Sequence, residues 1–381
     1  MLKKLITLLF WAGSLAPALA QLPNEALTEA WPSAAVQPGT LWLRAGQFGF
    51  LRNNEYFGSV ASGETFFGYQ ITPTLRYHAH ARFWVEAGLQ LIQDFGQEGF
   101  REIAPVLRLQ YRLDSLQIIL GSLQAHYAHR LIEPLYAFEQ GLRRRLEQGL
   151  QFRYQRGVWQ ADLWVDWQQT VNEARDRPEI IFGGLVSALY LVKRPSFSLC
   201  WPLQATIRHV GGQDLAIPIA QSNQFHLATG FQADWRFDKH RFWKRLRTEN
   251  YWVMASDSPA SRPEGGTNGQ GWYANLEVQT NWLGLLLSYW QAKDYRSDTG
   301  GELFGSFSRL RPTVYLPERK LLWVRLLRDF APYPDLRLSL RLEPYLDLEA
   351  GEWEYAFGFY VYYQPEFKLW TNKAPEQRKI K

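Results

Sequence analysis

Apolar and polar side chains alternate along this chain, and the alternation returns in about sixteen separate stretches. Residues 224–238 show the pattern most clearly. One face carries Phe225, Leu227, Thr229, Phe231, Ala233, Trp235 and Phe237, and the other carries Gln224, His226, Gln232, Asp234, Arg236 and Asp238. Successive side chains of a strand point to opposite faces, so each stretch is predicted to be a strand with one apolar and one polar wall. Such strands suit a sheet that covers a core or a closed barrel in lipid.

The first twenty residues indicate that the protein is exported. Lys3 and Lys4 precede an apolar run from Leu5 to Trp11, and Ala18-Leu19-Ala20 is a cleavage site with small residues at its first and third positions. The apolar run is shorter than the ~20 residues that a spanning helix needs. We therefore expect residues 1–20 to be a signal peptide. No later stretch supplies eighteen consecutive apolar residues, so spanning helices are not expected.

Composition favours the barrel over a soluble sandwich. Aromatic residues make up 15% of the chain, with 17 Trp, yet the mean hydropathy is −0.31. This combination is typical of strands with an aromatic outer face and a polar inner face. Without Lys3 and Lys4 the formal net charge falls from +5 to +3, which is too small to indicate a nucleic-acid partner. Cys200 is the only cysteine, so an internal disulfide is impossible.

Turn signals divide the chain into sixteen predicted strands. They are residues 40–50, 67–78, 82–93, 106–114, 116–124, 147–155, 158–168, 180–192, 197–208, 224–238, 242–255, 271–282, 283–293, 319–330, 336–346 and 353–364. Connections after even strands are short, and most connections after odd strands are long, as in outer-membrane barrels with short periplasmic turns and long extracellular loops.

We therefore predict an all-β protein with a single transmembrane antiparallel barrel of about 16 strands, 14 being the alternative. The expected divisions are a signal peptide (1–20), a periplasmic lead-in (21–39), the barrel (40–370) and a basic periplasmic tail (371–381). Two features fit less well. Pro202 interrupts one predicted strand, and residues 180–192 and 319–330 are apolar on both faces.

Charged residues on the inner faces are candidates for lining a pore and setting its selectivity. They are Arg108, Arg112, Asp162, Asp166, Asp234, Arg236, Arg337, Arg341 and Glu343. Charges of both signs suit a water-filled channel, and they equally suit ion pairs that close the lumen. Inner aromatic residues such as Trp164 and Tyr273 either stack on sugars or fill the lumen, whereas outer ones form interface girdles.

A long basic segment, residues 126–146, follows the fifth predicted strand on the extracellular side. Its candidates for a constriction are Arg130, Glu133, Arg143, Arg144 and Arg145. The segment either folds into the lumen and narrows it, or remains an exposed loop with solvated charges.

Chemistry-bearing residues form no familiar catalytic motif. His126 and His129 are close together in the sequence, but no serine or acid stands beside them at a recognisable spacing. No third metal ligand accompanies them, and the chain has no phosphate loop or zincin motif. We therefore expect no enzymatic activity, no metal and no cofactor.

One strand–loop–strand unit within residues 120–167 carries a family resemblance. Its runs are 121–123 (GSL), 129–135 (HRLIEPL), 147–152 (EQGLQF) and 162–167 (DLWVDW). On these residues the chain resembles the poorly characterised porin-like outer-membrane barrels of Bacteroidota. The resemblance implies an outer-membrane location and a pore, without a particular substrate.

The function expected from the sequence is a channel for passive or weakly selective passage of small hydrophilic solutes, because a sixteen-stranded barrel leaves an aqueous lumen unless something fills it. Outer-membrane lipid and those solutes are the expected partners. The alternative is a non-transporting barrel that serves as a subunit or scaffold of an outer-membrane assembly or export complex, which would add outer-membrane or periplasmic proteins as partners.

Overall fold

The computed structural model describes residues 24, 27–28, 37–144, 146–174, 176–212, 215–216, 221–237, 240, 242–258 and 268–372. The expected signal peptide (1–20), most of the lead-in (21–39) and most of the tail (371–381) lie outside the described residues, so those predictions remain untested. Arg145 lies outside them as well.

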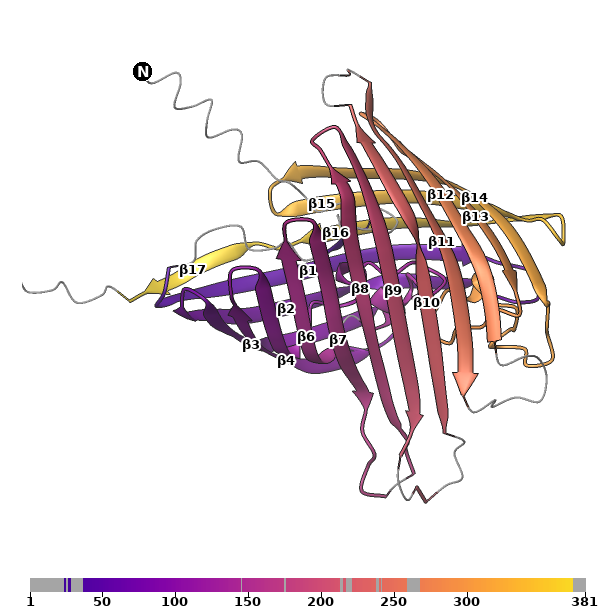
Figure 1. Ribbon diagram of the computed structural model, residues 1–381. Helices are drawn as coiled ribbons and strands as arrows, with labels where there is room; N and C mark the ends of the chain where they lie inside the picture. Colours follow the sequence, from indigo (N-terminus) through magenta and orange to yellow (C-terminus); the bar gives the residue numbers. More distant parts are fainter. Residues whose placement is uncertain are drawn as a thin grey trace, which may run out of the picture.

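Sixteen antiparallel strands form one closed barrel. They are β1 (Thr40–Glu55), β2 (Glu64–His80), β3 (Phe83–Asp94), β4 (Glu102–Arg112), β5 (Leu116–Ser122), β6 (Gln148–Arg156), β7 (Trp159–Gln169), β8 (Glu179–Lys193), β9 (Phe197–Gly211), β10 (Ser222–Arg236), β11 (Trp243–Ser258), β12 (Asn268–Thr280), β13 (Gly284–Lys293), β14 (Glu318–Tyr333), β15 (Leu336–Asp347) and β16 (Glu352–Tyr363). Each strand pairs with the next, and β1 pairs with both β2 and β16. The prediction of a sixteen-stranded barrel is confirmed, and strands of opposite walls cross steeply in Figure 1.

A short extra strand, β17 (Glu366–Thr371), continues the wall beyond β16 and was not predicted. It pairs with the start of β1, from Thr40↔Thr371 to Arg44↔Glu366. Pro365 separates it from β16, and its carbonyl accepts a hydrogen bond from Ala45 N at 3.1 Å. The first and last strands of the described chain therefore lie together at one end of the barrel.

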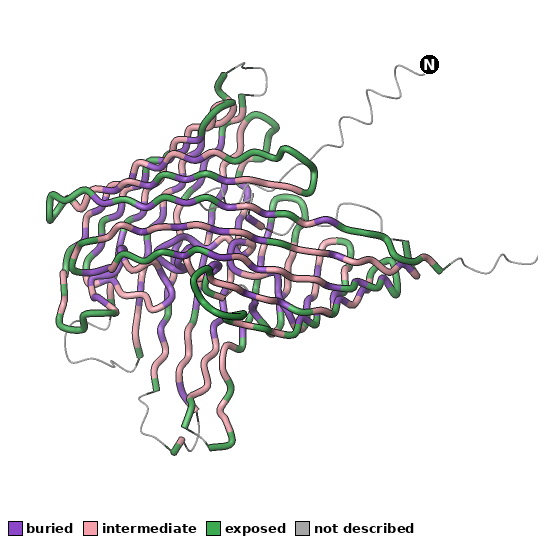
Figure 2. Tube along the Cα trace, turned by 180° about the vertical axis from the view of Figure 1, so that it is seen from behind, coloured by how far each residue is buried: buried purple, intermediate pink, exposed green. Residues whose placement is uncertain are grey.

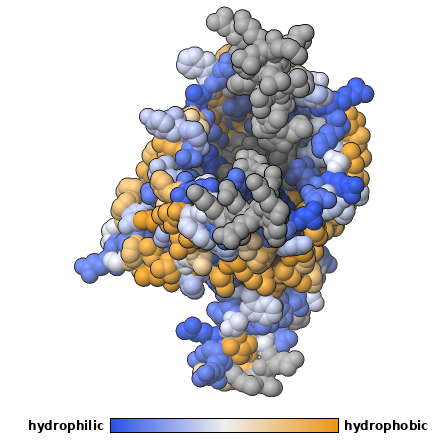
Figure 3. Space-filling view, turned by 90° about the vertical axis from the view of Figure 1, so that its left-hand side faces the viewer, coloured by the Kyte–Doolittle hydropathy of each residue, from blue (hydrophilic) through white to orange (hydrophobic). Residues whose placement is uncertain are grey.

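Apolar side chains form a band on the outer surface of the barrel, with hydrophilic residues towards both ends (Figure 3). The outer aromatic residues, which we expect to form interface girdles, are exposed there: Trp159, Trp167, Trp235, Trp272, Trp282, Trp353 and Tyr363. A charge on the lipid face near the midplane costs about 2–4 kcal/mol for Arg or Lys, which fixes the register with the charged face inward. Among the described residues, no helix combines the length and apolar character needed to traverse a bilayer.

The two sequence features that fitted poorly have physical explanations. Pro202 lies inside β9 and pairs with Ala188 of β8, but the ladder to β10 lacks partners beside it, between Leu203↔Thr229 and Cys200↔Gln232. The register does not shift there, and Thr229 Oγ1 donates to the Pro202 carbonyl at 3.1 Å. In β8 and β14 the inner apolar residues, such as Phe182 and Trp323, are buried against loops inside the lumen.

Two long connections fill the middle of the lumen (Figure 2). The first lumen loop (residues 123–147) contains the 3₁₀ turn η2 (His126–Ala128) and the short helix α2 (Gln140–Arg143); the second (residues 294–317) contains η3 (Glu302–Phe304). Their apolar residues pack with inward-facing residues of β5, β7, β8 and β10–β15 in one cluster. The lumen therefore has a packed core where an open barrel of this size has water.

Candidate functional site

Backbone hydrogen bonds join the two lumen loops into one plug. Ala137 N donates to the Thr299 carbonyl at 2.8 Å, and Gly301 N donates to the Glu133 carbonyl at 2.9 Å. Tyr295 Oη donates to the Pro134 carbonyl at 2.9 Å. These bonds satisfy backbone groups that the packed lumen removes from water.

An ion-paired cluster fastens the first lumen loop to the far wall. Glu133 Oε2 accepts from Arg325 Nη2 at 2.6 Å and from Tyr273 Oη at 3.1 Å. Arg325 also reaches Glu343 at 3.2 Å, and Glu343 pairs with Arg52 at 2.8 Å. Burial raises the pKa of Glu133, and Arg325 opposes that rise. A buried carboxylate with these partners has a structural role in holding the loop.

Backbone strain is concentrated where the first lumen loop begins. His126 and Arg130 adopt positive φ values of 45° and 63° without being glycine. A non-glycine residue in this region is uncommon and costs free energy that the surrounding structure must supply. Gln204 holds the strained turn, because its side chain accepts from Ile132 N at 2.9 Å and donates to the Arg130 carbonyl at 3.1 Å.

His126 forms a dyad with Glu147 at this turn. Its Nδ1 lies 2.7 Å from Glu147 Oε1, and both side chains are buried. We assign the imidazole proton to Nδ1, because that atom faces a carboxylate. Nε2 is also buried and has no hydrogen-bond partner in the part of the chain that the structure describes. The ring therefore presents an unused lone pair, as a general base does.

His129 ties the same carboxylate to the barrel wall. Its Nε2 lies 2.8 Å from Glu147 Oε2, and its Nδ1 lies 3.0 Å from Asp162 Oδ2. The ring stacks on Trp164 with centroids 3.7 Å apart. Burial opposes protonation of His129, but Glu147 and Asp162 outweigh it and raise its pKa to about 9. His129 is therefore the cation of this group at neutral pH.

Glu147 stays ionised between the two rings. Burial acts to raise its pKa, but His126 and His129 hold it well below the ordinary value. Tyr136 Oη donates to Glu147 at 3.3 Å and contacts His126 Nδ1. A fixed carboxylate that orients an imidazole is the arrangement that general-base hydrolysis requires. Within the described ranges, neither this cluster nor any other group of three or more His, Cys, Asp or Glu side chains is arranged to hold a metal ion.

The residues predicted to line a pore face inward, but most are paired. Arg108, Asp162, Asp166, Asp234, Arg341 and Glu343 are buried, while Arg112, Arg236 and Arg337 are half-buried. Arg108 donates to the Ser122 and Leu123 carbonyls, Asp234 pairs with Arg245, and the Arg341 guanidinium lies 4.9 Å from the Phe138 ring centre. Their role in selectivity remains a prediction, and the inner aromatics Trp164, Tyr273, Trp290 and Tyr360 are all buried.

The residues predicted to form a constriction are spread along the first lumen loop. Arg130 lines the cavity on the periplasmic side, and Glu133 lies in the packed centre. Arg143 is exposed and paired with Glu64, and Arg144 is half-buried. The loop does fold into the lumen, although these residues do not meet at a single ring.

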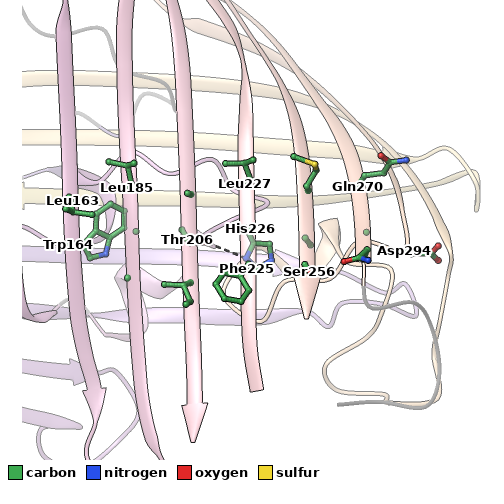
Figure 4. Close-up of a pocket in the computed structure, with 18 of the residues that line it drawn as sticks. Leu163, Trp164, Leu185, Thr206, Phe225, His226, Leu227, Ser256, Gln270 and Asp294 are labelled. Carbon is green, nitrogen blue, oxygen red and sulfur yellow. Dashed lines mark hydrogen bonds between the residues drawn. The ribbon is translucent and has the colours of Figure 1, made fainter. Parts of the chain in front are cut away.

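Two large hollows reach side chains that contact the dyad cluster, namely His129 and Asp162 in one and Trp164, which stacks on His129, in the other. One is a vestibule of about 840 Å³ at the periplasmic end, lined by His129 and Asp162 and by the basic residues Arg82, Arg112, Arg130, Arg153, Arg156 and Lys193. The other is an apolar groove of about 880 Å³ across β7–β13, where Gly183, Gly184 and Ala205 leave room between larger side chains (Figure 4). Leu163, Leu185, Leu227 and Phe225 line this groove.

Residues 33–372 match the family described as Lipid A 3'-O-deacylase-type. The chain belongs to this family. No match was found among curated proteins.

Membership of the Lipid A 3'-O-deacylase-type family overturns one expectation. The absence of a recognisable His–acid spacing led us to expect no enzyme, and that expectation was wrong. The acids that accompany the histidines, Glu147 and Asp162, come close to them only in the folded barrel.

 Glu147 lies 21 residues after His126 and 18 after His129, and Asp162 lies 33 residues after His129. Spacings this long carry no motif, and the positive φ of His126 has no signal in the sequence. The signal that the sequence did carry for this site was the set of charged residues in the long segment 126–146.

Solved outer-membrane barrels share the fold of this Lipid A 3'-O-deacylase-type protein. A loop-deletion variant of OmpT from Vibrio cholerae has a TM-score of 0.50 at 8% identity, covering 86% of this chain and 100% of that one. OccAB4 from Acinetobacter baumannii has 0.47 at 9% identity, covering 87% and 99%. OprD from Pseudomonas aeruginosa has 0.47 at 11% identity, covering 87% and 94%. At 8% identity the likeness to the OmpT variant concerns the fold alone, and it agrees with the barrel part of the resemblance to porin-like proteins.

Proposed function

We propose that the protein is an outer-membrane esterase that removes an acyl chain from a lipid A-type glycolipid. Family membership supports the substrate class. The observation that carries the chemistry is the His126–Glu147 dyad, whose Nε2 is buried without a partner among the described residues. The apolar outer band supports a location in the membrane that contains such lipids, and cleavage of residues 1–20 on export belongs to the same proposal.

The proposed hydrolysis uses the two members of the dyad in turn. His126 Nε2 removes a proton from water, and the resulting hydroxide adds to the ester carbonyl carbon. Glu147 stabilises the imidazolium that forms, because its carboxylate faces Nδ1 at 2.7 Å. The carbon–oxygen bond of the ester then breaks, and the imidazolium returns its proton to the leaving alkoxide. The products are a fatty acid and a glycolipid with a free hydroxyl group.

His126→Gln tests the proposal. The refolded barrel is mixed with purified lipid A in detergent micelles, and released fatty acid is measured by mass spectrometry. We expect the variant to lose about 100-fold or more of the rate, because general-base catalysis contributes roughly 10²–10⁴-fold. His80→Gln is the matched control, since His80 is exposed next to a short turn. A folded wild type that releases no acyl chain, or a fully active His126→Gln, would contradict the proposal.

Passage of small hydrophilic solutes is a second candidate, favoured by the basic vestibule of about 840 Å³. Solutes would have to pass the packed lumen loops, so the loops must shift for transport. Stable conductance steps from the pure protein in a planar bilayer would support this candidate. A silent bilayer, with folded protein confirmed, would count against it.

A further inference from the structure

The barrel wall has a gap in its pairing beside the candidate site. All of β4 from Glu102 to Tyr111 pairs with β3, but only Arg108–Arg112 pairs with β5. Glu102–Leu107 therefore has no strand on its other side among the described residues. Two side-chain contacts reach this edge: Leu107 N donates to Ser122 Oγ at 3.2 Å, and Gln148 Nε2 donates to the Pro105 carbonyl at 3.4 Å.

The gap exists because β5 and β6 are short. β5 ends at Ser122 and β6 begins at Gln148, whereas β7, on the far side of the gap, continues to Gln169. The last pair between β6 and β7 is Gly149↔Asp166. We call this gap, bounded by Glu102–Leu107 of β4 and Asp166–Gln169 of β7, the wall notch. Its β4 side is about 20 Å long at roughly 3.4 Å per residue.

The β4 rim of the notch carries exposed apolar side chains. On its rim Ile103 is 62% exposed and Leu107 is 55% exposed, on the lipid-facing side of β4. Unpaired backbone groups are not tolerated in hydrocarbon. A strand edge without a neighbour therefore needs polar partners, which water and lipid headgroups supply.

Cationic side chains lie at the notch. Arg101, next to the start of β4, donates to the Arg143 carbonyl at 2.8 Å, so the end of α2 lies at one rim. After α2 the chain continues to Glu147, which directly precedes β6. Arg144 lies on this return, is half-buried, and forms no ion pair with the described residues. Its charge acts on Tyr136 of the dyad cluster and on Asp166 of β7.

We infer that an anionic glycolipid enters the barrel sideways through the wall notch, with a headgroup phosphate on Arg144 and its acyl ester directed to His126. This inference rests on the proposed function and adds the route and the headgroup contact. Phosphate is the group that an unpaired guanidinium binds best, through two parallel hydrogen bonds. The acyl chains stay in hydrocarbon, where the apolar groove begins on β7, one strand from β6.

Retention of lipid in an inactive background tests the headgroup contact without relying on turnover. His126→Gln and the double variant His126→Gln/Arg144→Gln are incubated with bisphosphorylated lipid A, and bound lipid is counted by native mass spectrometry. We expect at least a tenfold loss of retained lipid in the double variant. His126→Gln/Arg194→Gln is the control, because Arg194 is exposed on a short turn. Equal retention in the Arg144 and Arg194 variants overturns the headgroup contact.

Filling the notch tests the route. Ala104→Trp adds a large side chain to the unpaired edge, and we expect a tenfold or greater loss of lipid A hydrolysis with little change for a water-soluble short-chain ester. Ala79→Trp, at an exposed position of β2, is the control. Equal losses on both esters, or none on lipid A, overturn lateral entry. If His126→Gln retains lipid but the wild type releases no acyl chain, the proposed function is contradicted. The lipid-binding site at the notch is then still supported.

Discussion

Glu147 is the residue on which the candidate site depends, because two imidazole rings share its carboxylate. His126 and His129 approach its two oxygens at 2.7 and 2.8 Å, and all three side chains are buried. Removing one partner of a buried ionic group leaves the other without compensation and typically costs about 3–5 kcal/mol. We therefore expect Glu147→Gln to lower the free energy of unfolding by about 3 kcal/mol and to reduce ester hydrolysis. Urea unfolding in detergent, followed by tryptophan fluorescence, measures the change; a variant as stable as the wild type would contradict it.

The raised pKa of His129 gives the stability a pH dependence. Its pKa is about 9 in the folded protein against 6.5 as the ordinary value. The folded state binds the proton more tightly, so the stabilisation is complete below about pH 6.5 and is lost as pH rises through 9. We expect the urea midpoint to fall between pH 7 and pH 10. In His129→Gln this fall should be much smaller, and an unchanged pH profile in that variant would refute the assignment to His129.

Single residues also show where sequence reasoning ends. The inward positions of Asp162 and Asp166 follow from alternation, since every second residue of a strand shares a face. The approach of His129 to Asp162 does not follow from it, because that contact depends on how a 25-residue connection folds inside the barrel. The left-handed backbone at His126 is imposed by tertiary contacts such as those of Gln204.

Among the elements, the first lumen loop depends on close packing at α2. A Cβ on Gly141 would collide with the ring of Tyr127, which is buried and donates to the Phe138 carbonyl. We expect Gly141→Val to loosen this loop and to increase trypsin cleavage after Arg143 several-fold, while the strands remain folded. Limited proteolysis with a heat-modifiability gel checks both points. Gly49→Ala is the control, since its Cβ would make only an ordinary contact with Val361; equal cleavage in the two variants would count against the packing argument.

Among the elements, the barrel strands could be predicted from the sequence, but the extra strand β17 could not. Period-two alternation and turn residues placed the barrel strands, because lipid outside and polar groups inside impose one pattern on most of them. β14 lacked the pattern because inner residues such as Leu321 and Trp323 pack on the second lumen loop. β17 has six residues after Pro365, too few to show a period.

The whole molecule is a barrel of channel size that carries its own plug. The plug is joined to the barrel wall through pairs such as Glu133–Arg325 and Arg52–Glu139, so it stays in place only while these buried contacts hold. A sixteen-stranded barrel without it would enclose an aqueous passage. Replacing residues 131–142 with a Gly/Ser linker is therefore expected to raise conductance in planar bilayers several-fold over the native protein. The same replacement of residues 95–100, which are all exposed, is the control and should leave conductance unchanged. If the plugless barrel conducts no better than the native one while remaining folded, the lumen is closed by something other than the first lumen loop.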